Sequence, residues 1–584
     1  MTFSGIGRRA AYVIACVAPA WAAITFVTDG FVWELGPLRV ASTEPLRPML
    51  IGAAAAAWCL LRSVRADIDG DGEWLRLWLG RIAKLATPLI VALGCAAGLF
   101  YGTFAAAGSD AYGYVSQAEL WLRRDLLIEQ PIVQQVSWPD AAWTFTPLGY
   151  RPVAALGTIA PTYPPGLPMM MAAFQGLFGR TAVFFVVPLL ASVALVATYM
   201  LGMAATRSQS VSALAALLLL ASPVFLAHAM VPMTDVPATA GWALACMLAL
   251  REPAPRPLLA GLAAGASILI RPNLILLSAV PILGWLLATR EAREGMRPAV
   301  RRIGAFLGGV LPALIVMAAI NLYMYGSVFE SGYGRFDEIY GSHAVARNVR
   351  NYAAWLTQTQ TLLVALALAP FVLRGSFRPS VAGSSPPAVL ASLLALVMLS
   401  YVFYAPFDNW TYLRFLLPAY PAMFVLMAAG VRALSARMPL AARPAVVMLF
   451  AAAAVSSAVQ FAKDEQVFHW RDHEQRYVRA AARASGLTPA TAVLFSSQHS
   501  GSLRYHADRM TLRYDLLPPD RLDSAIRELS ALGRPSFLVI DDWERDVFRS
   551  RFSGSRAGGL EGQPLARVPG QPDVLIFDLR NRVE

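Results

Sequence analysis

Long apolar runs, separated by short polar stretches, dominate the pattern of this chain. Thirteen of them are long enough to span a membrane fully or in part. The runs are 10–28, 47–63, 86–104, 180–203, 210–229, 236–250, 259–270, 273–289, 303–323, 360–374, 386–404, 415–433 and 444–462. The pattern therefore predicts a polytopic α-helical membrane protein with about 13 transmembrane helices.

The pattern changes after the last apolar run. From Lys463 onward, helical periodicity at Asp472–Ala484 and Pro519–Leu532 alternates with short apolar segments typical of strands. These segments are Ala492–Phe495, Phe537–Ile540 and Val574–Phe577. We expect a compact α/β domain over 463–584. Its sequence has no Gly-rich phosphate loop, nucleophile elbow or metal-ligand spacing, so we expect it to recognise an acceptor or partner, with His499 and His506 at its surface.

A shorter amphipathic pattern follows the third apolar run. Between Gly108 and Leu126, apolar residues recur at helical spacing, with polar residues on the other side. This predicts a helix on the bilayer surface that holds Asp110 at the water boundary. An acidic residue in a first helical turn is also favoured by the helix dipole, so a purely capping role for Asp110 is the alternative.

Composition agrees with a membrane protein. Of the 584 residues, 57% are apolar and 15% are charged, which is too apolar for a soluble chain of this size. The net charge of +12 comes from single Lys and Arg residues between apolar runs rather than from one basic cluster. The basic residues therefore indicate membrane topology rather than nucleic-acid binding.

The distribution of arginines predicts the orientation. With the N-terminus in the cytoplasm, the basic residues gather in the inside loops, most densely from Arg290 to Arg302, which holds five arginines. The first run follows Arg8 and Arg9 and is longer than a signal-peptide core, so we expect a retained helix. The prediction is a multi-pass protein of the cell (inner or plasma) membrane whose C-terminal domain is exported.

This orientation brings distant charged residues to the exported face. Asp110, Asp235, Arg271 and Arg414 all fall there. Arg271 precedes Pro272, which interrupts an apolar run, and a cation at such a break is suited to a lipid phosphate. Snorkelling to the interface is the alternative for both arginines, and helix capping is the alternative for Asp235.

Six motifs in this order resemble one enzyme group. They are D-A-Y-x-Y from Asp110, Y-P-P-G-L-P from Tyr163, M-T-D ending at Asp235, L-I-R-P around Arg271, Y-G-S-x-F-x-S-G-Y-G from Tyr325 and Y-L-R-F-L-L-P-A-Y-P around Arg414. Together they resemble the GT-C glycosyltransferase superfamily, in particular the protein O-mannosyltransferase and lipid A aminoarabinose transferase group. The resemblance covers about residues 86–435.

The resemblance implies a function and a set of roles. It implies inverting transfer of a sugar from a polyprenyl-phosphate-linked donor to a lipid, glycan or protein acceptor on the exported face. Asp110 and Asp235 resemble the catalytic acidic residues of the first and second exported loops, with Asp110 as the base, and Arg271 matches the basic position that meets the donor phosphate. We expect Arg414, a second arginine at membrane depth, to bind the donor phosphate as well. The expected substrate-contacting residues are Tyr112, Tyr114, Gln117, Tyr163 and Tyr333. A divalent metal is compatible with these carboxylates but not required, and the chain lacks a basic residue that some relatives carry near Tyr163.

The expected organisation has four parts. Residues 1–85 form the first helices and a cytoplasmic loop, 86–435 the GT-C-like core with a large first exported loop at 105–179, 436–462 the last transmembrane helix, and 463–584 the exported domain. The alternative functions are a flippase or transporter of lipid-linked glycans and a glycan polymerase or ligase. Only one clear helix break is visible, whereas many transporters carry paired breaks in two halves.

Overall fold

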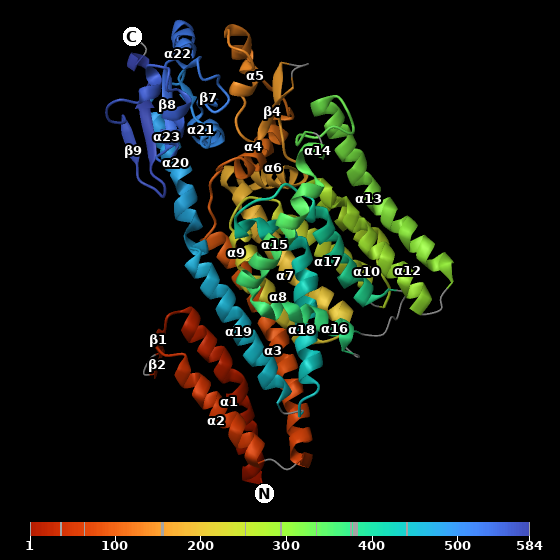
Figure 1. Ribbon diagram of the computed structural model, residues 1–584. Helices are drawn as coiled ribbons and strands as arrows, with labels where there is room; N and C mark the ends of the chain where they lie inside the picture. Colours follow the sequence, from red (N-terminus) through yellow and green to blue (C-terminus); the bar gives the residue numbers. More distant parts are fainter. Residues whose placement is uncertain are drawn as a thin grey trace.

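The computed structural model describes residues 2–582, apart from 36–37, 63–64, 154–156, 252, 292–294, 335, 374–376, 378–383 and 440–441. A helical body carries a sheet-containing domain at one end, and the N-terminus lies at the opposite end (Figure 1). Residues 292–294 belong to the predicted loop from Arg290 to Arg302, and this part of the loop lies outside the described residues.

Each of the thirteen predicted apolar runs coincides over most of its described length with one or more helical segments, although residues 101–104 and 403–404 lie beyond their helices. The α-helices of the body are α1 (Thr2–Val27), α2 (Leu46–Arg62), α3 (Arg65–Phe100), α7 (Val186–Thr206), α8 (Gln209–Ala221), α9 (Pro223–Ala229), α10 (Asp235–Leu250), α11 (Pro257–Ile270), α12 (Ala279–Glu291), α13 (Met296–Tyr325), α14 (Phe336–Ile339), α15 (Val345–Gln360), α16 (Ala369–Val372), α17 (Pro386–Val402), α18 (Tyr420–Ser435) and α19 (Arg443–Asp464). Short 3₁₀ segments join several of them: η3 (Arg180–Phe185), η4 (Pro272–Ser278), η5 (Ser342–Ala344), η6 (Leu362–Leu368), η7 (Trp410–Ala419) and η8 (Val467–His469). A short hairpin of β1 (Phe31–Leu35) and β2 (Leu38–Ser42) connects α1 and α2.

The lengths of these helices fit a multi-pass membrane protein. Within the described residues, 7 helical stretches are long and apolar enough to cross a membrane, or up to 9 if each of two bent pairs is one span. The bent pairs are Gln209–Ala221 with Pro223–Ala229 and Ser342–Gln360 with Leu362–Val372. The other predicted runs fall on apolar helices of 10–17 residues. The predicted fold class, a polytopic helical membrane protein with a C-terminal α/β domain, is confirmed.

Proline accounts for two breaks in the body. Pro223 is the first residue of α9, and the axes of α8 and α9 differ by 65°. Pro272 follows α11 and begins η4. Because proline lacks an N–H and its ring clashes with the preceding turn, neither helix continues through its proline.

The long loop 105–179 forms a small layer above the helical body (Figure 1). It contains α4 (Asp110–Arg123), η1 (Pro131–Gln135), α5 (Ala141–Thr144) and α6 (Gly166–Phe178). Its three strands, β3 (Ile128–Glu129), β4 (Tyr150–Val153) and β5 (Thr158–Pro161), form an antiparallel sheet in the order β3-β5-β4. This sheet precedes the turn at Tyr163 and so fixes where that residue lies.

The C-terminal domain contains a mixed five-stranded sheet in the order β7-β6-β8-β10-β9. Its strands are β6 (Val493–Phe495), β7 (Met510–Leu512), β8 (Ser536–Asp541), β9 (Ala566–Val568) and β10 (Val574–Asp578). Its helical segments are α20 (Trp470–Leu487), α21 (Ser500–Ala507), α22 (Leu522–Ala531), α23 (Glu544–Arg551), η9 (Ala557–Gly559) and η10 (Arg580–Arg582). β6 pairs in parallel with β7 and β8, and β10 pairs antiparallel with β8 and β9. The two predicted helices and three predicted strands are all present.

The long loop and the C-terminal domain share one apolar core. Ile132, Trp138, Ala141 and Phe145 belong to the same buried cluster as strand residues such as Leu538 and Phe577. Hydrogen bonds join the two parts as well: the Arg513 N–H donates to the Thr144 carbonyl at 2.7 Å, and the Ser137 hydroxyl donates to Glu528 Oε1 at 2.7 Å. The loop therefore supplies part of the interior of the domain.

The positions of α4 and of one histidine differ from expectation. Helix α4 was predicted on the bilayer surface, but α6 and α21 pack against it and most of its residues are buried. His499 was predicted at the surface, but it is fully buried and its Nε2 lies 2.9 Å from Asp541 Oδ1. Burial would raise the pKa of Asp541, but the bond to His499 and the charge of Arg476 hold it below its usual value. Both residues that were expected at a surface are covered by other parts of the fold: α4 by α6 and α21, and His499 by the rest of the C-terminal domain.

Candidate functional site

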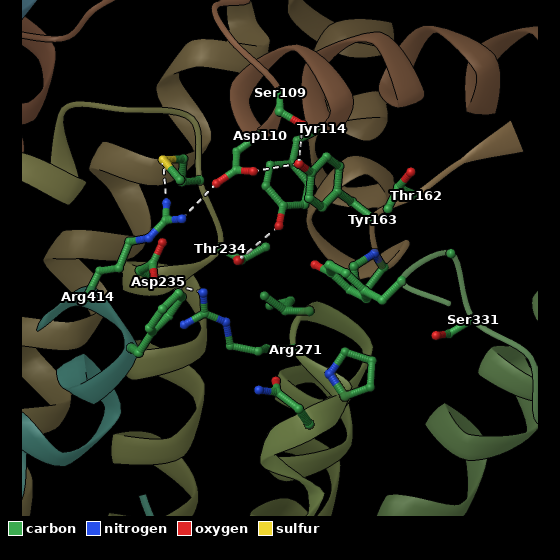
Figure 2. A pocket seen from close by; sticks show the side chains of 18 of the residues that line it. Ser109, Asp110, Tyr114, Thr162, Tyr163, Thr234, Asp235, Arg271, Ser331 and Arg414 are labelled. Carbon is green, nitrogen blue, oxygen red and sulfur yellow. Dashed lines mark hydrogen bonds and ion pairs between the residues drawn. The ribbon is translucent and has the colours of Figure 1, made fainter. Parts of the chain in front are cut away.

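A cavity of about 890 Å³ lies where the long loop, the helical body and the C-terminal domain meet. It is lined by residues of α4, by the Tyr163 turn and by the ends of α10, α11 and η7. The four charged residues singled out from the sequence all line it: Asp110, Asp235, Arg271 and Arg414. Figure 2 shows their side chains converging on a common space.

Asp110 is the first residue of α4 and uses both carboxylate oxygens. The Tyr163 hydroxyl donates to Asp110 Oδ1 at 2.5 Å and lies 2.7 Å from the Ser109 hydroxyl. Arg414 Nη2 lies 2.9 Å from Asp110 Oδ2 (Figure 2). Asp110 is thus held between a neutral hydroxyl and a cation.

Tyr163 remains protonated in this environment. Burial, followed by the negative charge of Asp110, raises the pKa of Tyr163 well above its usual value. Its ring packs against Tyr114 at 4.7 Å and against Tyr333 at 5.9 Å between centroids. The tyrosine is therefore a fixed hydrogen-bond donor to Asp110 rather than a base.

Asp235 begins α10 and forms a second ion pair, with Arg271. Arg271 Nη2 lies 2.8 Å from Asp235 Oδ1, and the Asp235 side chain is 1% exposed. The guanidinium also lies over the rings of Tyr401 and Phe415, at 5.9 Å and 5.6 Å from their centroids. Arg271 is directed at a carboxylate and two aromatic rings, not outward as a snorkelling side chain would be.

The position of Arg271 follows from the break after α11. Helix α11 ends at Ile270, and Pro272 prevents its continuation, so Arg271 leaves the helical path. The Y-P-P-G turn packs against this break: a Cβ on Gly166 would lie 2.6 Å from the Ile270 nitrogen. Only glycine allows this approach, which places the Tyr163 turn and Arg271 on the same cavity.

Each arginine keeps one N–H group unused among the described residues. Arg271 Nη1 and Arg414 Nε are buried and have no hydrogen-bond partner there. Arg414 Nη1 donates to Met233 Sδ at 3.4 Å, and thioether sulfur is a weak acceptor. The cavity therefore offers two cations with free donors beside two carboxylates, an arrangement that accommodates an anionic ligand.

The predicted substrate-contacting residues divide into two groups. Tyr114, Tyr163 and Tyr333 line the cavity, and the Tyr114 hydroxyl lies 3.2 Å from the Thr234 hydroxyl. Tyr112 packs against Tyr150, 5.6 Å between ring centroids, and does not line the cavity. Gln117 is buried away from the cavity, and neither amide atom has a partner among the described residues. The helical pattern alone does not distinguish the cavity face of α4 from the face that the C-terminal domain covers.

Sequence reasoning missed a second set of cavity residues. Tyr340, Tyr401 and Tyr404 form an aromatic wall, and Trp470 and Glu474 come from the first helix of the C-terminal domain. None of these three tyrosines lies in the six motifs; Tyr401 and Tyr404 end the apolar run 386–404, which predicts a helix but not a cavity wall. Nothing in the pattern of α20 marks Trp470 or Glu474 as facing the cavity.

The carboxylates of the cavity are not part of a cluster of metal ligands among the described residues. Among the described residues, no group of three or more His, Cys, Asp and Glu side chains has a spacing that could hold a metal ion. In the cavity, both aspartates have arginine as their charged neighbour.

Comparison with known proteins yields one family match and several similar structures. Residues 162–323 match the family described as dolichyl-phosphate-mannose-protein mannosyltransferase. No curated protein matches the chain in sequence. The crystal structure of ArnT from Cupriavidus metallidurans bound to undecaprenyl phosphate is 14% identical with a TM-score of 0.54, over 85% of this chain and 98% of that chain. The same ArnT in its apo state is 13% identical with a TM-score of 0.51, over the same shares of the two chains.

The two ArnT comparisons show the fold. The chain shares the fold of ArnT over 85% of its length, which is more than the family match covers. Fold and family match together confirm the predicted resemblance to GT-C glycosyltransferases, and with it the class of enzyme, a membrane glycosyltransferase.

Proposed function

We propose that this GT-C-type glycosyltransferase transfers a sugar from a polyprenyl-phosphate-linked donor to an acceptor on the exported face of the membrane, with inversion at the anomeric carbon. One observation carries the proposal: two largely buried arginines share a cavity with Asp110 and Asp235, and each has a buried nitrogen from which no described residue accepts a hydrogen bond. ArnT, whose fold the chain shares, has been crystallised with undecaprenyl phosphate, which supports a lipid phosphate as the anionic ligand.

Asp110 acts as the general base in this proposal. It takes the proton of the acceptor hydroxyl as that oxygen attacks the anomeric carbon of the donor sugar. Its helix begins at this residue, and Tyr163 fixes the orientation of its carboxylate through the 2.5 Å hydrogen bond. The new bond joins the acceptor oxygen to the anomeric carbon, and the proton passes to Asp110.

The arginines hold the leaving group. The bond between the anomeric carbon and the phosphate oxygen breaks, and the electron pair stays on the lipid phosphate. Arg271 Nη1 and Arg414 Nε, which have no acceptor within the described part of the chain, are the donors that meet that phosphate. Because Arg414 also pairs with Asp110, a phosphate that draws Arg414 toward itself exposes Asp110 Oδ2 to the acceptor. Donor binding and activation of the base are linked in this way.

Asp235 has a positioning role. It is buried and contacts Arg271 at 2.8 Å, so it fixes the arginine and balances its charge before the donor arrives. This assignment differs from that of Asp110, whose side chain lines the same cavity but is 30% exposed.

The orientation and organisation expected from the sequence belong to the same proposal. The N-terminus lies in the cytoplasm, the cavity and the C-terminal domain lie on the exported face of the cell membrane, and residues 86–435 form the transferase core. The five arginines from Arg290 to Arg302 support this orientation. In a cysteine-free background, Ser550→Cys should react with an impermeant maleimide in intact cells, and Gly295→Cys only after permeabilisation. The reverse labelling would overturn the orientation.

Lipid analysis tests the donor class directly. Native mass spectrometry of the purified protein in nanodiscs should show binding of added undecaprenyl phosphate above that of phosphatidylglycerol, and lipid extracts should contain a polyprenyl-phosphate sugar. Equal binding of both lipids, together with no glycosylated polyprenyl phosphate in the extract, would overturn the proposal.

A further inference from the structure

The first helix of the C-terminal domain contributes one wall of the cavity. Trp470 and Glu474 on α20 both line it, and their spacing of four residues places them on one face of the helix. The Trp470 ring lies 6.1 Å from the His228 ring of α9, which locates this end of α20 against the helical body. The C-terminal domain is therefore adjacent to the reacting groups as well as to the long loop.

Several contacts fix α20 in this position, and none of them uses Glu474. The Gln475 amide donates to the Thr103 carbonyl at 2.8 Å, and Arg471 Nη1 donates to the Phe100 carbonyl at 2.9 Å. Tyr477 packs with Ala105 and Ala107 in a small buried cluster. The segment that these residues hold leads directly into Asp110, so the distance between α20 and the base is set by a short, anchored stretch of chain.

Glu474 is the unexplained member of this wall. Its side chain is partly buried, and its carboxylate makes no hydrogen bond with the residues that the structure describes. Burial raises the pKa of Glu474 above its usual value. A partly buried carboxylate that lines a cavity and has no partner among the described residues is available to accept a hydrogen bond from a ligand. Both cavity arginines already have a carboxylate partner, so an ion pair with either is not the explanation.

We infer that Glu474 is an acceptor-binding residue that receives a hydrogen bond from a hydroxyl group of the substrate accepting the sugar. This inference rests on the proposed glycosyl transfer and identifies the acceptor as a polyhydroxylated molecule, such as a glycan or a sugar headgroup. A hydroxyl fits better than an ammonium because Arg476, itself paired with Asp541, places a positive charge near Glu474. The C-terminal domain then selects the acceptor, while the transferase core holds the donor.

The test separates use of the acceptor from use of the donor. A strain that lacks this protein supplies two preparations: extracted polyprenyl-phosphate sugar at a fixed, saturating amount, and an envelope fraction that is serially diluted as the source of acceptor. Consumption of the lipid-linked sugar is followed by mass spectrometry. Binding of undecaprenyl phosphate is measured on the same proteins.

Glu474→Ala should raise the half-saturating amount of the envelope fraction about tenfold, with the maximal rate changed less than about twofold. Glu474→Gln should raise it only about threefold, because its amide oxygen still accepts from a hydroxyl. Asp472→Asn is the matched control: it lies in the first turn of the same helix, is exposed and does not line the cavity, and it should match the wild type.

Two results would overturn the inference. One is a saturation curve of Glu474→Ala that superimposes on that of the wild type. The other is an equal loss in Glu474→Gln and Glu474→Ala, which would indicate an ammonium rather than a hydroxyl partner. If the wild type consumes no lipid-linked sugar and binds no undecaprenyl phosphate, the proposed function itself fails, and this result is distinct from both.

Discussion

The two carboxylate–arginine pairs of the cavity have almost the same contact distance but different surroundings. Asp235 and Arg271 are 2.8 Å apart, with side chains 1% and 13% exposed. Asp110 and Arg414 are 2.9 Å apart, with side chains 30% and 16% exposed. The carboxylate of Asp235 is buried, whereas that of Asp110 is partly exposed in the cavity and also accepts a hydrogen bond from Tyr163.

The difference indicates two kinds of role for one chemical pairing. A buried pair is strongly coupled to stability because loss of either partner leaves an unbalanced charge in a medium of low dielectric constant. A partly exposed pair depends less on its partner, so its members remain free to change partners during a reaction. We therefore expect substitutions at the Asp235 pair to affect folding and phosphate binding, and substitutions at Asp110 to affect the transfer step.

The largest effect should come from Asp110→Asn. The amide keeps the shape of the side chain but does not take up the acceptor proton, so the transfer rate should fall about 10²- to 10⁴-fold. Binding of undecaprenyl phosphate should be largely retained. Asparagine is an equally good residue at a helix start, so a role limited to helix capping would leave the rate near wild type. Transfer rate, lipid binding and protein abundance on this one variant separate the two interpretations.

Asp235→Asn should mainly reduce stability. It leaves Arg271 buried without its counter-charge, and breaking a buried pair in this way costs about 3–5 kcal/mol. Thermal unfolding in detergent should show the loss, and Asp110→Asn is the comparison with a smaller shift. The double variant Asp235→Asn with Arg271→Gln should recover much of the stability, because no isolated charge remains. A single variant as stable as the wild type would remove the contrast between the pairs.

Arg271→Ala should weaken donor binding about 10- to 100-fold, which corresponds to the loss of charge-assisted hydrogen bonds to a phosphate. Arg271→Lys should be milder because it keeps the charge while losing the planar, two-pronged geometry. Titration with undecaprenyl phosphate measures both. An unchanged affinity of Arg271→Ala for undecaprenyl phosphate would mean that Arg271 does not bind the donor and that its role is limited to the ion pair with Asp235.

The smallest effect is expected for Tyr163→Phe. The ring stays packed between Tyr114 and Tyr333, but the hydrogen bond to Asp110 is lost. A hydrogen bond contributes about 0.5–1.5 kcal/mol, so the transfer rate should fall about two- to tenfold, with lipid binding unaffected. A loss as large as that of Asp110→Asn would mean that Tyr163 takes part in proton transfer itself.

The sequence was sufficient for the membrane body and for the charged half of the site. Apolar runs identify helices because every backbone polar group in a membrane must be satisfied within its own segment. Charged residues at membrane depth are rare and costly, which is why Asp110, Asp235, Arg271 and Arg414 were visible as candidates. Their convergence on one cavity followed from placing them on one face of the membrane.

Two features were not predictable: which aspartate pairs with which arginine, and how the C-terminal domain packs against α4 and the cavity. Which aspartate meets which arginine depends on helix breaks at Pro223 and Pro272 whose angles no local pattern encodes. Tyr112 and Gln117 have the same polarity and spacing as cavity residues, but they lie on the face of α4 turned away from the cavity. Glu474 is an ordinary residue of a helix until that helix is placed against the cavity.

The apolar core shared by the long loop and the C-terminal domain has a consequence for synthesis of the protein. Trp138 and Phe145 leave the ribosome well before Val493 and the other strands that bury them. At about 5–20 residues per second, the interval between Phe145 and Val493 lasts roughly 17–70 s. During that time the loop carries uncovered aromatic side chains, so its folding must wait for the end of translation. Truncation of the chain before this point would leave those side chains exposed and the nascent protein a target for proteolysis.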